Sequence, residues 1–244
     1  MRQVRSLIET TSRCLYCQNT FSERPGWNWV FSFHKQEPLC QRCRDMFVRI
    51  EGDVCRDCGR PSEESAETDT CQDCRQWQTD SFWESNSFQH RALYAYNDFM
   101  KDVIKTLKYT GDVALVDLFA EDLRKLVDKH VRHTVAIPIP ITKKRAFERG
   151  FNQAEQLGRA FTLTHALERV DSGEQQSKRT RKERIDALDG AFQVTSTLDP
   201  SQLNNQSVVI IDDVYTTGAT LRAAAKPLLE AGAARVFAVT VARS

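Results

Sequence analysis

Two adjacent carboxylates follow a hydrophobic run and precede a loop rich in threonine. The run Val208–Ile211 predicts a buried strand, and Asp212 and Asp213 come at its carboxyl end. Backbone N–H groups of the next loop, at the start of a predicted helix, can bind a phosphate group, and Gly218 permits its close approach. The two carboxylates could then accept hydrogen bonds from the hydroxyl groups of a ribose whose 5-phosphate lies in the loop. The loop residues that would bind the phosphate are Thr216, Thr217, Gly218 and Thr220.

The segment Val208–Thr220 resembles the signature for 5-phosphoribosyl-1-pyrophosphate (PRPP) in the type I phosphoribosyltransferases. It contains the hydrophobic strand, both acidic residues and the Thr-Thr-Gly-Ala-Thr loop in the order of that signature. The resemblance implies that Asp212 and Asp213, the catalytic candidates, anchor the ribose. It also implies that Mg²⁺ binds together with the pyrophosphate of PRPP.

A basic segment, Lys143–Gln153, follows the predicted strand Thr134–Pro140. In a PRPP-binding fold the loop after this strand would face the pyrophosphate, where cationic side chains offset its charge. The candidate contacts are Lys144, Arg145 and Arg149. An ordinary solvated surface is the alternative interpretation of this segment.

Two further groups of cations are candidates for binding an extended anion. One group is five of seven successive residues in a predicted mobile loop: Lys178, Arg179, Arg181, Lys182 and Arg184. The other group, Lys101, Lys105 and Lys108, lies on one side of a predicted amphipathic helix. A solvated protein surface explains the first group equally well.

The eight cysteines form four pairs with two residues between the members of each pair: Cys14/Cys17, Cys40/Cys43, Cys55/Cys58 and Cys71/Cys74. Two such pairs complete a tetrahedral site of four thiolates, so the spacing predicts two zinc ions. A closed four-thiolate site has no open coordination position, which makes the zinc structural. The pairs could combine in chain order, or the first with the third and the second with the fourth. Redox-active cysteines and an iron–sulfur cluster are the alternatives to zinc.

Aromatic residues occupy every second position between the first two cysteine pairs, namely Trp27, Trp29, Phe31 and Phe33. This alternation predicts a strand with four rings on one face. One interpretation is a platform on which single-stranded bases stack. The other is that the rings cover the zinc sites or the neighbouring domain.

Composition limits the class of protein. Hydrophobic residues make up 41% of the 244 residues and charged residues 27%, as in ordinary globular proteins, so wholesale disorder is excluded. The net charge of +1 is too small to indicate nucleic-acid binding by itself. The chain shows neither the apolar core of a signal peptide nor a run of about 18 apolar residues, so we expect a cytoplasmic protein.

Strands and helices alternate after about Arg91, which predicts an α/β fold with a mainly parallel sheet flanked by helices and ligands at the carboxyl ends of its strands. The PRPP signature makes this sheet similar to that of the type I phosphoribosyltransferases. All eight cysteines precede it. We therefore expect a small double zinc-ribbon module over residues 1–80 and a phosphoribosyltransferase-like domain over residues 81–244.

The motifs together resemble the ComF family of bacterial competence proteins, over nearly the whole chain. They are the cysteine pairs, the region Ala92–Asp112, the basic segment with Arg-Gly-Phe-Asn-Gln at Arg149–Gln153, and the PRPP signature. The resemblance implies a protein that handles incoming single-stranded DNA in natural transformation, together with a DNA-uptake ATPase of the ComFA type.

Two functions from different classes remain open. In the first, the protein handles single-stranded DNA and keeps the PRPP site for sensing a ligand or for an undefined transfer. In the second, it is a PRPP-dependent phosphoribosyltransferase that acts on an unidentified acceptor. Binding of single-stranded DNA that weakens steeply with salt would favour the first function.

Overall fold

The computed structural model describes residues 10–23, 38–62, 69–110, 113–132, 134–170, 188 and 190–244. Contacts divide the chain into two compact units, Met1–Val48 and Arg49–Ser244. This division lies before the boundary expected at residue 80. The physical reason is that Cys55, Cys58 and Cys74 belong to the same hydrophobic core as the central strands of the second unit.

The first unit has little regular structure in its described part. Strands β1 (Thr10–Arg13) and β2 (Thr20–Glu23) pair antiparallel. Helix α1 (Gln41–Asp45) starts directly after Cys40, which is its N-cap residue. The first cysteine pair therefore lies in the turn between two strands and the second at the beginning of a helix.

The second unit begins with two short helices, α2 (Gln72–Gln78) and α3 (Ser81–Ser85). Cys71 is the N-cap residue of α2, as Cys40 is of α1, so the two halves of the Cys-rich segment repeat one local structure. Asp80 caps α3 by accepting hydrogen bonds from the backbone N–H groups of Phe82 and Trp83.

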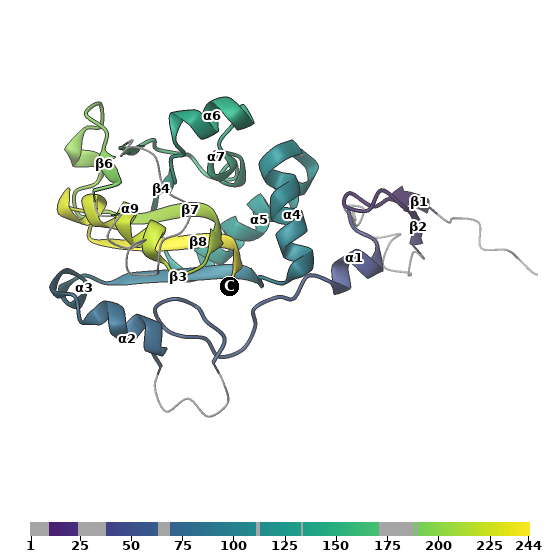
Figure 1. The fold of residues 1–244 in the computed structure, drawn as a ribbon, viewed down its shortest axis with the longest axis horizontal. Coiled ribbons are helices and arrows are strands. Elements are labelled where there is room, and N and C mark those ends of the chain that lie inside the picture. The colour runs from purple at the N-terminus through teal and green to yellow at the C-terminus, as the bar shows by residue number, and fades with distance from the viewer. Residues whose placement is uncertain are drawn as a thin grey trace, which may run out of the picture. The chain divides into compact units, whose positions relative to one another are not determined.

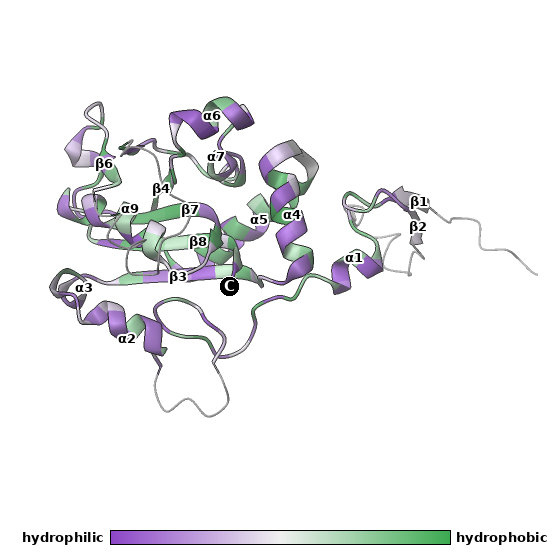
Figure 2. Ribbon diagram, viewed as in Figure 1, coloured by the Kyte–Doolittle hydropathy of each residue, from purple (hydrophilic) through white to green (hydrophobic). Residues whose placement is uncertain are grey.

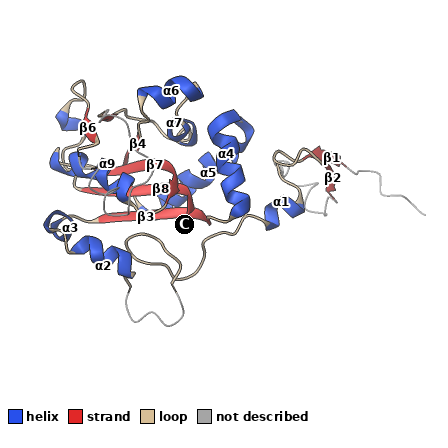
Figure 3. Cartoon of the chain, viewed as in Figure 1, coloured by secondary structure: helices blue, strands red, loops and turns tan. Residues whose placement is uncertain are grey.

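Four parallel strands form the central sheet, in the order β3-β8-β7-β4 (Figure 3). Their bounds are Phe88–Ala95 for β3, Thr134–Pro138 for β4, Ser207–Tyr215 for β7 and Arg235–Arg243 for β8. The central strands β7 and β8 are buried along nearly their whole length, which explains their continuous apolar sequence. The expected α/β fold with a parallel sheet is confirmed.

Long amphipathic helices cover the sheet (Figure 1). Helices α4 (Asp98–Thr110) and α5 (Val113–His130) follow β3, and α5 packs against β3 and β8. The apolar stripe expected on α4, at Met100, Val103, Ile104 and Leu107, is buried. Helix α9 (Ala219–Glu230) connects β7 to β8 and packs against both strands. No helix within the described ranges is long and apolar enough to cross a membrane.

The chain between β4 and β7 forms shorter elements. Helices α6 (Lys143–Arg149) and α7 (Gln153–Leu157) come first, followed by the antiparallel strands β5 (Leu167–Arg169) and β6 (Phe192–Val194) and by the 3-10 helix η2 (Pro200–Gln202). Figure 2 shows that β7 and β8 are largely hydrophobic whereas α6 is largely hydrophilic. The sheet is thus the rigid core, and α6 is a surface element near its edge strand.

Candidate functional site

The loop between β7 and α9 and the first turn of α9 contain the candidate phosphate-binding residues expected from the sequence. Asp212 and Asp213 are the sixth and seventh residues of β7, and the loop from Thr216 leads directly into α9. The hydroxyl group of Thr217 accepts a hydrogen bond from the backbone N–H of Ala219 at 3.4 Å. The first-turn N–H groups of a helix of this length attract an anion.

Gly218 is the N-cap residue of α9, and its conformation excludes other residues. Its φ of 79° lies in the left-handed region that favours glycine. A Cβ atom built on Gly218 would overlap the Tyr215 hydroxyl and lie 2.7 Å from the Cζ atom of that ring. The loop therefore owes its shape both to glycine and to the tyrosine behind it.

A cavity of about 700 Å³ lies above this loop. Of the candidate residues expected from the sequence, seven line it: Asp212, Asp213, Thr216, Thr217, Thr220, Arg145 and Arg149. Gly218 lies in the loop but does not line the cavity, and Lys144 is an exposed residue of α6 that does not line it either. The cavity thus combines two carboxylates, hydroxyl groups and guanidinium groups, a set that can bind both the sugar and the phosphates of a phosphoribosyl compound.

Lys108 is a residue of this cavity that the sequence analysis assigned elsewhere. It was expected on a basic helix face with Lys101 and Lys105, and those two residues are exposed. The Lys108 ammonium instead forms an ion pair with the Asp213 carboxylate, with Nζ and Oδ2 2.6 Å apart. No local pattern distinguishes Lys108 from its neighbours, since its role depends on α4 lying beside the end of β7.

The two carboxylates of the site have different surroundings. Asp213 is held by Lys108, whereas the Oδ1 atom of Asp212 accepts the backbone N–H of Asp213 at 2.8 Å. Burial of its carboxyl group, and then the adjacent Asp213 carboxylate, raise the pKa of Asp212 to about 8. The surroundings of Asp212 thus favour the protonated form of its carboxyl group more than those of an ordinary aspartate do.

The Arg-Gly-Phe-Asn-Gln sequence has a structural explanation. Asn152 caps α7 by accepting the N–H of Ala154 at 3.0 Å, and its amide group donates to the Ile139 carbonyl at 2.9 Å. Gln153 accepts a hydrogen bond from Arg149 at 2.8 Å. The motif thus joins the end of β4 to α7 and orients one of the two guanidinium groups that line the cavity.

Helix α6 carries both of these guanidinium groups, Arg145 and Arg149. Thr142 caps its start, Gly150 ends it in a left-handed conformation, and none of its residues is buried. Phe147 is 92% exposed. This ring lies on one helix with four cationic side chains, Lys143, Lys144, Arg145 and Arg149.

The eight cysteines form two groups in chain order: Cys14, Cys17, Cys40 and Cys43, and then Cys55, Cys58, Cys71 and Cys74. Within each group all sulfur atoms lie within 4.8 Å of one another, and none of the eight cysteines is in a disulfide. The sulfurs of Cys17 and Cys40 are 3.8 Å apart, and those of Cys58 and Cys71 are 3.6 Å apart. Tetrahedral zinc with bonds of about 2.3 Å requires sulfurs about 3.8 Å apart. Both groups can hold a metal ion, and their donors and spacing fit zinc.

Two sequence features named above lie outside the described residues. They are the aromatic row Trp27–Phe33 and the basic cluster 178–184. Their predicted roles therefore stay predictions.

Comparison with known proteins gives relatives that match almost the whole chain. It is 37% identical over 236 residues to Competence protein ComFC of Bacillus subtilis (strain 168), which covers 95% of each chain. It is 32% identical over 234 residues to Competence protein ComFC of Streptococcus pneumoniae (strain ATCC BAA-255 / R6), which covers 95% of this chain and 100% of the relative. Competence protein F of Haemophilus influenzae is 29% identical over 115 residues, 44% of this chain and 49% of that protein.

The phosphoribosyl transferase domain family matches residues 143–244, which include α6, α7, the loop and the last two strands of the chain. This match covers the residues that line most of the cavity. Together with two relatives of one name that are similar over 95% of the chain, and with the two four-cysteine groups, it shows that the chain belongs to the ComFC family of competence proteins.

Proposed function

We propose that this protein binds PRPP or a related phosphoribosyl compound in the cavity and binds single-stranded DNA on the surface beside it. In this role it would handle incoming DNA during natural transformation, in the cytoplasm and together with a ComFA-type ATPase. The names of its relatives support the role in competence. The match to the phosphoribosyl transferase domain supports a phosphoribosyl compound as the ligand.

Different residues of the cavity would bind different parts of PRPP. The loop Thr216–Thr220 would bind the 5-phosphate through backbone N–H groups and hydroxyls, and Asp212 and Asp213 would bind the ribose hydroxyls. Arg145 and Arg149 would offset the charge of the pyrophosphate. Mg²⁺, bound with the pyrophosphate, would supply further charge compensation.

One observation carries the DNA-binding half of the proposal: α6 lines the cavity and also presents an exposed ring and cations to solvent. Its Arg145 lines the cavity, whereas Phe147 is exposed to solvent beside Lys143 and Lys144. Cations for the phosphates and a ring for an unpaired base are the features that bind single strands without sequence preference. Because α6 belongs to both surfaces, we expect the phosphoribosyl ligand to alter DNA binding.

Two zinc ions would complete the protein. Each four-cysteine group would hold one ion without an open coordination position, so the ions would stabilise the fold and take no part in a reaction. Zinc content measured by mass spectrometry of the purified protein should approach two ions per chain. Iron in place of zinc, or a content near zero, would contradict this assignment.

Titration of labelled single-stranded DNA with zinc-loaded protein tests the proposal. We expect binding, followed by fluorescence anisotropy, to weaken steeply between low and high salt and to change when Mg–PRPP is added. The double variant Asp212→Asn with Asp213→Asn should lose PRPP binding and the effect of PRPP on DNA, while DNA binding in the absence of PRPP persists. Absence of DNA binding at any salt concentration would reject the DNA-handling function, and normal PRPP binding by the double variant would reject the site.

The match to the phosphoribosyl transferase domain favours a second candidate function, transfer of the phosphoribosyl group to an acceptor. The carboxylates would hold the ribose while the bond between its anomeric carbon and the pyrophosphate breaks. Release of pyrophosphate from Mg–PRPP in the presence of candidate acceptors, with the double variant as control, would demonstrate turnover. PRPP binding without pyrophosphate release from any acceptor would leave sensing as the function of the site.

A further inference from the structure

The second cysteine group is built into the core of the phosphoribosyl-binding unit. Three of its four cysteines are buried, and they share a hydrophobic cluster with Ile210 of β7 and Leu221 of α9. A closed zinc ribbon that served only to fold itself would not need this position. Three side chains connect this group to the phosphate-binding loop.

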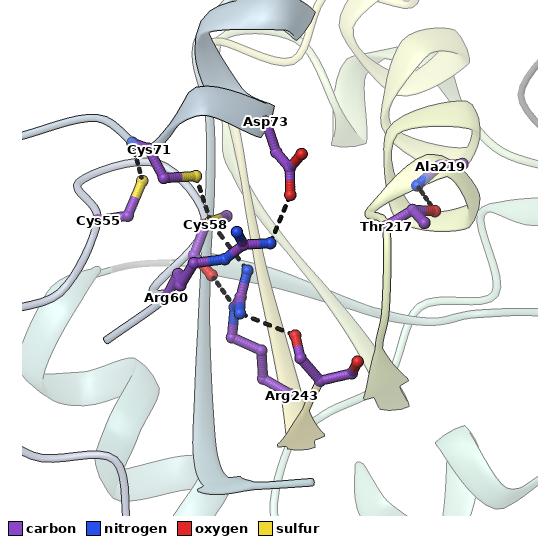
Figure 4. A network of polar contacts seen from close by, with 9 residues as sticks. Cys55, Cys58, Arg60, Cys71, Asp73, Thr217, Ala219 and Arg243 are labelled. Atoms are coloured by element: carbon purple, nitrogen blue, oxygen red, sulfur yellow. Dashed lines mark hydrogen bonds and ion pairs between the residues drawn. The ribbon is translucent and has the colours of Figure 1, made fainter. Parts of the chain in front are cut away.

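Arg243 forms the first connection (Figure 4). It lies at the carboxyl end of β8 and is 5% exposed. Its Nη2 atom donates to the Cys58 sulfur at 3.2 Å and its Nε atom donates to the Cys58 carbonyl at 3.1 Å. Its guanidinium carbon also lies 5.2 Å from the ring centre of Tyr215. One side chain therefore touches both a metal-ligand candidate and the residue behind Gly218.

His90 forms a parallel connection from the same carbonyl group. Its Nδ1 atom lies 2.9 Å from the Cys58 carbonyl oxygen and its Nε2 atom 2.9 Å from the Thr240 hydroxyl. Its ring stacks on Tyr215 with the ring centres 4.1 Å apart. Tyr215 in turn leaves no room for a side chain at Gly218. The packed rings of His90 and Tyr215 thus connect the Cys58 backbone to the phosphate-binding loop, so a shift of one would displace the other.

Arg222 forms an independent connection, through α2 and α3. Its guanidinium carbon lies 4.9 Å from the ring centres of Trp77 and Trp83 and 4.6 Å from that of Phe88. Its backbone N–H donates to the carbonyl of Gly218 at 2.9 Å, in the first turn of α9. A buried cation enclosed by aromatic rings is a strong contact. The helix that begins at Cys71 therefore holds the start of the phosphate-binding helix.

We propose that metal occupancy of the Cys55, Cys58, Cys71 and Cys74 group sets the affinity of the loop Thr216–Thr220 for a phosphoribosyl ligand, with Arg243 and Arg222 as positioning residues. This inference rests on the proposed function of the cavity. Without the ion, the four sulfur atoms lose the partner that holds them within 4.8 Å of one another, and the Cys58 carbonyl loses its fixed position. Its two donors, Arg243 and His90, then lose the acceptor that orients them against Tyr215.

Reciprocity between two binding sites provides the first test. If zinc in the second group strengthens PRPP binding by some factor, PRPP must strengthen zinc binding there by the same factor, typically about 5- to 150-fold. We would measure zinc affinity by competition with a zinc-selective chelator, with and without Mg–PRPP, and PRPP affinity by calorimetry on zinc-loaded and zinc-depleted protein. The variant Cys14→Ser with Cys17→Ser identifies which ion belongs to the second group. Equal PRPP affinities with and without the second ion overturn the proposal.

Variants that keep every cysteine provide the second test, because zinc depletion could unfold the unit. Arg243→Gln and Arg222→Met should retain two zinc ions and weaken PRPP binding by about tenfold each, within the usual range of such couplings. Arg235→Gln is the matched control: it lies at the start of the same strand and donates to Ser207. We expect its PRPP affinity to remain within about twofold of the wild type, since surface changes of this kind cost little.

The outcomes separate the inference from the function on which it rests. A zinc-loaded wild-type protein that binds no PRPP overturns the proposed function and the inference with it. A wild type that binds PRPP, with Arg243→Gln and Arg222→Met binding it equally well, overturns the inference alone. Weaker binding by both variants, with the zinc content unchanged and Arg235→Gln normal, supports it.

Discussion

The two walls of the candidate cavity differ in how they are held. The wall formed by the end of β7 and the loop before α9 rests on buried strands, with Val208, Val209, Ile210 and Ile211 fully buried. The wall formed by α6 has no buried residue: Arg149 at its end donates to Gln153, and a hydrogen bond from Asn152 to Ile139 joins the chain on either side of the helix. A rigid wall can recognise one geometry, such as a ribose 5-phosphate, whereas exposed cations attract anions of many shapes.

Because the two walls are held differently, substitutions on them should affect stability and ligand binding differently. On the rigid wall any change of side chain is resisted by close packing, so substitutions there should alter both folding and ligand affinity. On α6 the side chains touch little besides solvent, so substitutions should alter affinity alone. Unfolding and binding measured on the same variants therefore test whether the two walls differ in this way.

The largest effect is expected from Gly218→Ala. The left-handed backbone conformation opposes alanine, and its Cβ atom would overlap the Tyr215 side chain. Together these should lower the free energy of unfolding by about 3 kcal/mol and weaken PRPP binding at least about 100-fold. Thermal unfolding and calorimetric titration with Mg–PRPP would measure the two effects.

Gly150→Ala is the matched control, at the end of α6. Gly150 also has a left-handed conformation, with φ of 75°, but a Cβ atom there would meet nothing within 4 Å. Only the backbone conformation opposes alanine, and we expect a loss of about 1 kcal/mol. If the two variants were equally destabilised, the loop before α9 would be no more rigid than the end of α6.

In contrast to Gly218→Ala, the variant Asp212→Asn is expected to raise the free energy of unfolding. The pKa of Asp212 is raised to about 8 in the folded protein, so the folded state binds its proton more tightly than the unfolded state does. Stability is therefore fully retained below about pH 4, where the unfolded carboxyl is also protonated, and falls as the pH rises towards 8. Asparagine has no proton to lose, so we expect its stabilising effect to be almost zero at pH 4 and to grow as the pH rises towards 8.

Asp213→Asn should not give this gain, because it breaks the ion pair with Lys108. Thermal unfolding of both variants between pH 4 and pH 8 would check the difference. A gain for Asp212→Asn that does not depend on pH would contradict the proposed proton on Asp212. The same variant should bind PRPP poorly. Residues that a binding site needs for its ligand often lower the stability of the fold, so replacing Asp212 should raise stability and weaken binding.

The sequence predicted those parts of the site that depend on local order. Asp212 lies near the end of a strand, and the threonines lie between that strand and the first turn of a helix. The four cysteine pairs at fixed spacing form two groups in chain order, one of the two arrangements left open. The ion pair between Lys108 and Asp213 could not be predicted, since it joins residues from elements that meet only in the folded sheet. The same holds for Arg243 and Cys58, which lie 185 residues apart in the chain and contact each other.

The smallest effect on folding, and the most specific effect on binding, is expected from Phe147→Ala. Because Phe147 is 92% exposed, its loss should change the free energy of unfolding by less than about 0.5 kcal/mol. A base that stacks on its ring would lose about 1 to 3 kcal/mol, so affinity for single-stranded DNA should fall about tenfold while PRPP affinity is unchanged. Phe147→Leu should bind DNA as weakly as the alanine variant, and Phe147→Trp should bind it at least as tightly as the wild type, because stacking needs a ring and not merely an apolar surface. Equal DNA affinities for all four proteins, measured by anisotropy at one salt concentration, would show that α6 contributes charge alone and that the bases are bound elsewhere.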